Sequence, residues 1–164
     1  QETWRRLNMA AGDVIQEFAY RKRKVTLKTN TGVTKGDVLA YDTDGYAPVA
    51  YVPGTGIPGT GIGPYFVALQ TVAAPGAGLQ AECEVLEEGV VVVNKVTGAI
   101  VDGAWVVLST TAGKVTAFSN ADVGATYAED TIQDAIEMIY RRVGRAYGAA
   151  ASGDTTVKIR LLSA

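Results

Sequence analysis

The sequence has no histidine and a single cysteine among its 164 residues. Without histidine the chain lacks the commonest general base and metal ligand, so Ser/His/Asp and Cys/His nucleophile systems are excluded. Cys83 has no second cysteine to form a disulfide with, and at an inward-facing strand position we expect it to be a small buried hydrophobic residue. No run of about 18 apolar residues is present, so we expect no membrane-spanning helix.

Close carboxylate pairs are the remaining candidates for acid–base or metal chemistry. They are Asp42 with Asp44, Glu82 with Glu84, and Glu87 with Glu88. The first pair lies in an Asp-x-Asp-Gly turn, where turn geometry favours aspartate, and weak calcium binding is the alternative. Glu82 and Glu84 alternate along a strand and share its solvent face. Because nothing in the sequence indicates two carboxylates across a cleft, we expect neither an enzyme nor a bound metal or cofactor.

Basic residues are concentrated at the start of the chain. Residues 1–28 carry seven lysines and arginines against three acidic residues, whereas the rest of the chain carries eight basic and fourteen acidic residues. We therefore expect a basic N-terminal arm over residues 1–24, ahead of an acidic body over residues 25–164, that meets an acidic partner surface. For Arg21, Lys22, Arg23 and Lys24 the alternative is a solvated strand edge, which such residues protect from unwanted pairing. Nucleic-acid binding is not expected, because the body is acidic and the aromatics do not interleave with the basic cluster.

The strand and turn pattern of the body occurs twice. A hairpin over residues 36–49 is echoed over 103–117, and a second hairpin over 65–86 is echoed over 143–161. This self-similarity predicts an all-β body, resembling a β-barrel or β-sandwich, built from two pseudo-repeated halves of two hairpins each. Residues 90–93 are an unbroken run of valine, which predicts a core strand. We expect this run and Trp105 to serve folding rather than recognition.

One segment of the second half departs from the strand pattern. Residues 129–142 place apolar side chains with the spacing of one helical face, and charges at the two ends oppose the helix dipole. The apolar members are Ile132, Ala135, Ile136, Ile139 and Tyr140. We predict one inserted amphipathic α-helix over about residues 129–142. It either covers an open end of the body or lines a subunit interface through Ile132, Ile136 and Ile139.

The order and spacing of several segments resemble a known family. They are Lys35-Gly36-Asp37-Val38-Leu39, residues 67–69, 84–90, 102–106 and 113–116, and the hairpin from Val143-Gly144-Arg145-Ala146 to Thr156-Val157-Lys158-Ile159-Arg160-Leu161. This pattern, over about residues 33–162, resembles the capsid cement, or head decoration, proteins of tailed bacteriophages. The arm and the inserted helix depart from the short members of that family.

The resemblance implies a structural role without chemistry. Members of the family are small β-barrel-like proteins that bind the outside of an expanded icosahedral head and bridge neighbouring major capsid subunits, commonly as trimers. The expectation is thus a virion protein on the outer capsid surface, with the major capsid protein and two further copies of itself as partners. The capsid contacts we expect are Trp4, Arg5, Arg6 and Leu7 as arm anchors, and Arg21, Lys22, Arg23 and Lys24 as the electrostatic contact.

A carbohydrate- or surface-binding β module is the alternative. Such modules expose a flat row of aromatic rings, and four tyrosines cluster in the first half of the chain. They are Tyr41, Tyr46, Tyr51 and Tyr65. Strand packing and edge cover are the other explanation of these rings.

Overall fold

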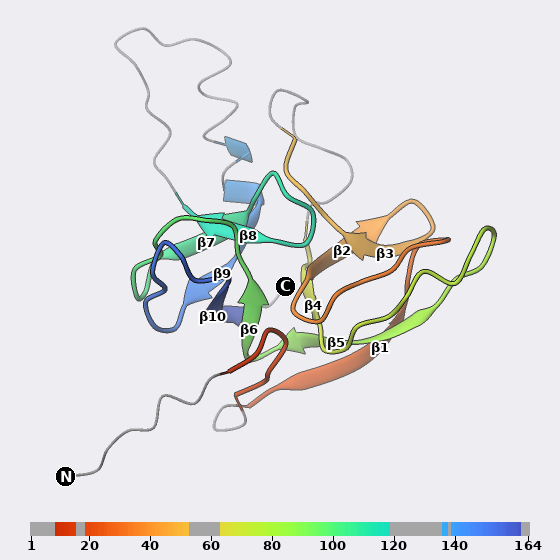
Figure 1. Cartoon of the computed structure of the whole chain (residues 1–164), viewed down its shortest axis with the longest axis horizontal. Coiled ribbons are helices and arrows are strands. Elements are labelled where there is room, and N and C mark those ends of the chain that lie inside the picture. The colour runs from red at the N-terminus through yellow and green to blue at the C-terminus, as the bar shows by residue number, and fades with distance from the viewer. Residues whose placement is uncertain (1–8, 16–18, 53–62, 119–135, 138, 162–164) are drawn as a thin grey trace, which may run out of the picture.

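Two antiparallel five-stranded sheets make up the protein in a computed structural model, which describes residues 9–15, 19–52, 63–118, 136–137 and 139–161. The first sheet has the strand order β1-β5-β4-β2-β3 and the second has the order β6-β10-β9-β7-β8, and the two lie side by side in Figure 1. The first contains β1 (Arg21–Thr26), β2 (Val38–Asp42), β3 (Gly45–Pro48), β4 (Phe66–Ala68) and β5 (Glu82–Glu88). The second contains β6 (Val90–Asn94), β7 (Trp105–Leu108), β8 (Val115–Ala117), β9 (Arg142–Ala146) and β10 (Thr156–Leu161).

The predicted duplication is present in the strand order. Adding five to each strand number of the first sheet gives the order of the second. The unit is larger than the two hairpins predicted, because β1 and β6 each begin one copy. Neither sheet closes into a barrel in the described residues. In each sheet, the residue just after the first edge strand forms one isolated parallel bridge with the other edge strand. Leu27, after β1, pairs with Tyr46 of β3, and Lys95, after β6, pairs with Val115 of β8.

Matching hydrogen bonds place the two copies in register. Gly36 N–H donates to Ala68 C=O at 2.8 Å, and Gly103 N–H donates to Ala146 C=O at 3.0 Å. The two isolated bridges make Lys95 the equivalent of Leu27. Both Gly36 and Gly103 have positive φ, at 88° and 76°, which L side chains rarely adopt.

A hydrophobic core shared by both sheets joins the two halves. Its members from the first sheet include Val38, Ala40, Val67 and Leu86, and those from the second include Val91, Val93, Val106 and Ile159. The valine run of β6 is buried, as predicted. A second cluster lies on the other face of the first sheet and contains Leu39, Phe66 and the fully buried Cys83. Burial of side chains on both faces of the first sheet explains why β4 is apolar throughout, whereas β5 keeps Glu82 and Glu84 on an exposed face.

Residues 9–15, here called the N-terminal clip, connect the two halves. Val92 of β6 accepts a hydrogen bond from Gly12 N–H and donates to Asp13 C=O at 3.0 Å. Asp13 Oδ1 also pairs with Lys35 Nζ of the first half at 2.9 Å. A Cβ on Gly36 would overlap the Cβ of Ala11, so glycine lets the clip pack closely there.

The inserted helix predicted over residues 129–142 is not seen. Residues 129–135 and 138 lie outside the described residues, and only 136, 137, 139 and 140 among the others are helical. One turn is held by Arg141 N–H donating to Glu137 C=O at 3.1 Å. Arg142, predicted to be in the last helical turn, begins β9 and lies opposite Val107, because sheet pairing overrides the helical spacing there. In the part of the chain that the structure describes, no helix is long and apolar enough to span a membrane.

Candidate partner-binding surfaces

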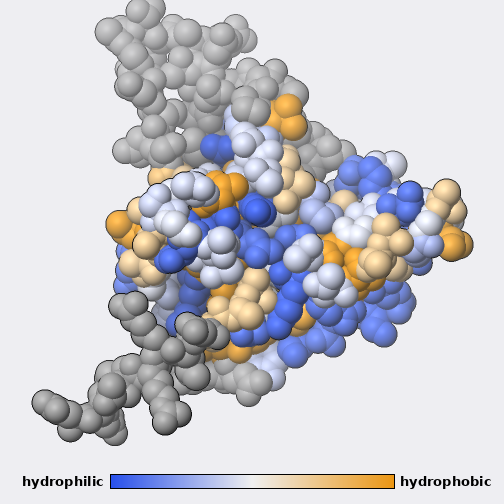
Figure 2. All heavy atoms as spheres, in the orientation of Figure 1, coloured by the Kyte–Doolittle hydropathy of each residue, from blue (hydrophilic) through white to orange (hydrophobic). Residues whose placement is uncertain are grey.

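The basic residues 21–24 form the start of edge strand β1, which is the solvated strand edge considered as the alternative to an arm. All of these side chains are exposed, and each faces a carboxylate of β5. Arg21 Nε lies 3.0 Å and Arg23 Nη1 lies 3.7 Å from oxygens of Glu87. Figure 2 shows hydrophilic side chains gathered over β1 and β5. Four basic side chains thus share three carboxylates, so the positive charge of this run is only partly compensated across the sheet.

The two lysines of β1 make similar pairs on the opposite face of the strand. Lys22 Nζ lies 3.6 Å from Glu84 Oε1, and Lys24 Nζ lies 3.5 Å from Glu82 Oε2. Glu82 and Glu84 share the solvent face, as predicted. Because these ion pairs are solvent-exposed, each contributes at most about 1 kcal/mol and is screened by salt.

The other predicted contact residues are only partly placed. Trp4, Arg5, Arg6, Leu7 and Ile132 lie outside the described residues. Ile136 and Ile139 belong to the helical turn that the structure describes and are 40% and 51% exposed. Tyr140 on the same turn is also exposed. Their role in a subunit interface stays a prediction.

A stack of two arginines on Trp105 is a surface that the sequence analysis missed. The guanidinium carbons of Arg142 and Arg145 both lie 4.4 Å from the centroid of the half-buried Trp105 ring. Arg145 also lies opposite Trp105 on β7. Tryptophan and arginine are the residue types most enriched at interface hot spots, and each cation–π contact is worth about 0.5–1 kcal/mol at an exposed site. We name these three residues the arginine–tryptophan stack.

A β-bulge creates the arginine–tryptophan stack. Residues three apart on a regular strand point to opposite faces. On β9, however, Val106 lies opposite Gly144 and Val107 lies opposite Arg142, so one extra residue is inserted between the pairs. Arg142 and Arg145 thereby reach the same tryptophan. A period-two pattern in the sequence cannot show this, although three arginines within 141–145 beside a tryptophan strand were the available signal.

The tyrosines considered for carbohydrate binding do not form a flat exposed row. Tyr65 is buried, and burial raises the pKa of its hydroxyl to about 12. The ring of Tyr41 meets that of Tyr46 edge-on, with an interplanar angle of 83°. Tyr51 donates a hydrogen bond to Oε2 of the buried Glu137 at 2.7 Å, and Arg141 lies 3.8 Å above its ring. Packing and buried hydrogen bonding thus account for most of these rings.

The turn carboxylates considered for calcium binding are engaged within the chain. Asp42 Oδ2 pairs with Lys28 Nζ at 2.8 Å, and the hydrogen bond from this ammonium lowers the pKa of the carboxyl. Asp44 Oδ2 accepts a hydrogen bond from the Thr29 hydroxyl at 2.5 Å, which lowers the pKa of Asp44. Within the described ranges, no group of three or more His, Cys, Asp or Glu side chains is arranged to hold a metal ion.

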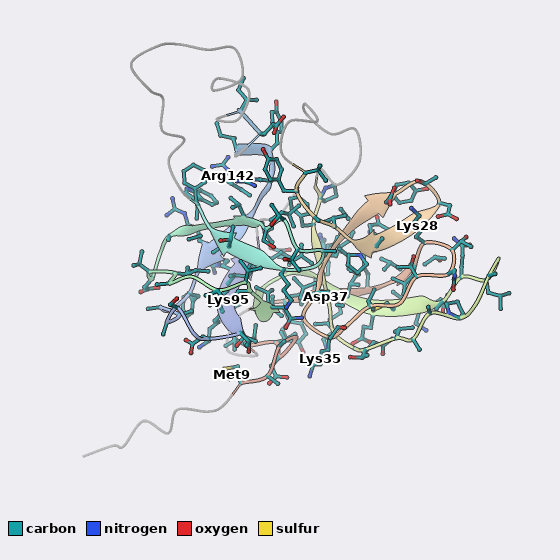
Figure 3. The ribbon with its side chains drawn as sticks, turned by 45° about the horizontal axis from the view of Figure 1, so that its top comes forward. Met9, Lys28, Lys35, Asp37, Lys95 and Arg142 are labelled. Atoms are coloured by element: carbon teal, nitrogen blue, oxygen red, sulfur yellow. The ribbon has the colours of Figure 1, made fainter. Side chains whose placement is uncertain are left out.

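Asp37 is a nearly buried carboxylate at the junction of the halves, close to Lys35 in Figure 3. Its oxygens accept hydrogen bonds from Thr34 N–H at 2.9 Å and from Asn94 Nδ2 of β6 at 3.0 Å. Desolvation by burial nevertheless raises its pKa above the usual 3.8. The folded state therefore holds this proton more tightly than the unfolded chain does.

The raised pKa of Asp37 gives a testable pH dependence. Between pH 3.8 and the raised pKa, the folded state binds more protons, so the Asp37 contribution to stability falls as pH rises. The variant Asp37→Asn removes this pH-dependent contribution to stability. It also leaves one acceptor oxygen where the Asp37 carboxylate has two. We expect the variant to be less stable, with a deficit that shrinks from about pH 3 to about pH 7. Urea unfolding across that range measures it, and a deficit independent of pH would contradict this account.

Comparisons with known proteins add no identification. No protein-family model matches the chain, and searches of curated proteins and of solved structures returned no match. Interpretation of the function therefore rests on the residues, the fold and the sequence resemblance.

Proposed function

We propose that the protein is a structural component of a tailed-phage virion that binds the outer surface of the icosahedral head and bridges major capsid subunits. The arginine–tryptophan stack carries the proposal, because it gathers on one face of the second sheet the residue types that protein interfaces favour. The segments that resemble cement proteins include β9 and β10, and the stack lies on β7 and β9.

A doubled β body suits a bridging role. The two sheets share one core, and the N-terminal clip bonds β6 to Lys35 of the first half. Such a body resists separation of its halves when partners on either side move. The clip holds residues 9–15 against the body, so the proposed anchors Trp4, Arg5, Arg6 and Leu7 lie within eight residues of it, at most about 26 Å away along an extended chain.

The proposal includes a homotrimer with the exposed turn at Ile136 and Ile139 as a candidate subunit contact. Three copies would engage the head at three places at once, so weak single contacts would combine into durable attachment.

Binding to expanded heads of the phage that encodes the chain tests the proposal. We expect the full chain to co-sediment with the heads. The variant Trp105→Ala should bind about tenfold more weakly, because it removes the platform on which Arg142 and Arg145 stack. Deletion of residues 1–8 should weaken binding independently. Truncation at residue 8 is preferable to a longer deletion, because removing Gly12 would break the clip.

Lys158→Gln is the matched control, since it removes a positive charge from the second sheet without touching the stack. Failure of the unmodified chain to bind heads would refute the proposed function. Normal binding by both Trp105→Ala and the truncated chain would refute these contact residues while leaving the function intact.

A further inference from the structure

The register between β1 and β5 determines which backbone N–H and C=O groups of β1 point outward, away from β5. Glu84 C=O accepts a hydrogen bond from Leu69 N–H at 2.9 Å, so the backbone groups of Glu84 face β4. Lys24 lies opposite Glu84 in the antiparallel pair. Because hydrogen-bonded and non-hydrogen-bonded pairs alternate, the N–H and C=O of Lys24 point away from β5. The same alternation turns Lys22, opposite Leu86, outward.

The second half shows how such an edge is covered. Val92 of β6 lies opposite Lys158, and Lys158 C=O accepts a hydrogen bond from Tyr147 N–H at 2.8 Å. Val92 is therefore the equivalent of Lys24. Its outward N–H and C=O are both bonded to the N-terminal clip. Among the residues that the structure describes, no segment occupies the corresponding edge of β1.

We propose that the β1 edge binds an extended acidic segment of a partner protein, which adds to the first sheet as the clip adds to the second. Backbone hydrogen bonds to Lys22 and Lys24 would supply the affinity of such strand addition. Side chains would supply the selectivity, because Arg21 and Arg23 lie on one face of β1 and the two lysines on the other.

Charge distribution identifies the occupant. A strand lying beside β1 places its own side chains next to the basic residues on both faces, so acidic residues are favoured. The present partners of the lysines, Glu82 and Glu84, are held at 3.5 Å and 3.6 Å in exposed pairs. Because these pairs are weak, little free energy is lost when a lysine turns to a carboxylate of the incoming strand or is shared between the two carboxylates.

A second copy of the chain does not fit this edge. Two β1 edges paired antiparallel would set one run of basic side chains directly against another, which destabilises the pair. The run thus guards the edge against self-association while leaving it open to a strand of opposite charge. The acidic segment is defined by its chemistry alone, so the edge is testable whether or not the protein binds phage heads.

Two synthetic strands test the proposal on the full chain. One alternates threonine and glutamate, and its neutral counterpart alternates threonine and glutamine. We expect the acidic peptide to bind and to slow hydrogen exchange of the Lys24 amide about tenfold, with an affinity that falls as salt is added. The neutral peptide should bind at least about tenfold more weakly.

Lys24→Pro removes the outward N–H without a loss to the β5 ladder, and proline is tolerated on edge strands. It should weaken binding of the acidic peptide about tenfold. The double variant Lys22→Gln/Lys24→Gln keeps the backbone intact and should reduce the salt dependence, whereas Lys158→Gln should bind normally. Equal binding of the two peptides, unchanged binding by Lys24→Pro, or a Lys24 amide already protected in the free chain would each overturn the proposal.

Discussion

A valine in place of Gly144 is expected to lower the free energy of unfolding by about 4 kcal/mol. Gly144 lies on β9, which is flanked by β10 and β7, and it pairs with Leu161 and Val106. A Cβ at this position would overlap the carbonyl oxygen of Arg160. Because that oxygen belongs to the backbone of the next strand, no side-chain rotation relieves the overlap. The strands must move apart at the centre of the sheet.

Chemical unfolding followed by circular dichroism measures this loss. Gly153→Val is the matched control, because a Cβ at Gly153 meets no atom within 4 Å and its φ is not positive. We expect the control to change stability by at most about 0.5 kcal/mol. Similar losses in the two variants would show that chain flexibility, rather than the close approach to Arg160, determines the effect.

The hairpins and the duplication were predictable because their signals are local. Alternating apolar residues and turn residues recur in the same order in both halves, and these segments became β2–β3, β4–β5, β7–β8 and β9–β10. The first strand of each copy escaped recognition as a repeat. Lys24 corresponds to Val92, and Leu27 to Lys95, so the two strands share hydrogen-bond register but differ in side-chain chemistry at these positions. Because register exists only in the folded sheet, comparison of the residues alone could not show that β1 and β6 are equivalent.

The candidate surfaces show the same limit. A charge count along the chain left open whether residues 21–24 belong to a basic arm or to a solvated strand edge, because their carboxylate partners on β5 are distant in sequence. Trp105 was assigned to folding, because only the bulge on β9 brings Arg142 and Arg145 to its ring. The apolar spacing near Ile136 and Ile139 corresponds to a helical turn in the described residues, and pairing of Arg142 with β7 ends the helix earlier than predicted. In each case a long-range pairing decided the outcome.

Lys95 is a buried cation where the other half has a leucine. Only 2% of Lys95 is exposed, compared with none of Leu27. Its ammonium donates to the carbonyls of Val96 at 3.0 Å, Gly98 at 2.8 Å and Ser152 at 3.5 Å. Figure 3 places it within the second half, and in the described residues it forms no salt bridge. These carbonyls come from the turns after β6 and before β10, so Lys95 joins the two.

Lys95→Met is accordingly expected to lower the free energy of unfolding by about 3 kcal/mol. Methionine keeps most of the volume but leaves buried carbonyls without their charged donor. Leu27→Met at the equivalent position is the control, and a volume-conserving exchange there should cost less than about 1.5 kcal/mol. Removal of a buried charge is neutral or stabilising in some proteins, because the charge no longer has to be desolvated. A Lys95→Met variant as stable as the unmodified chain would place this lysine in that class and show that the turns hold together without it.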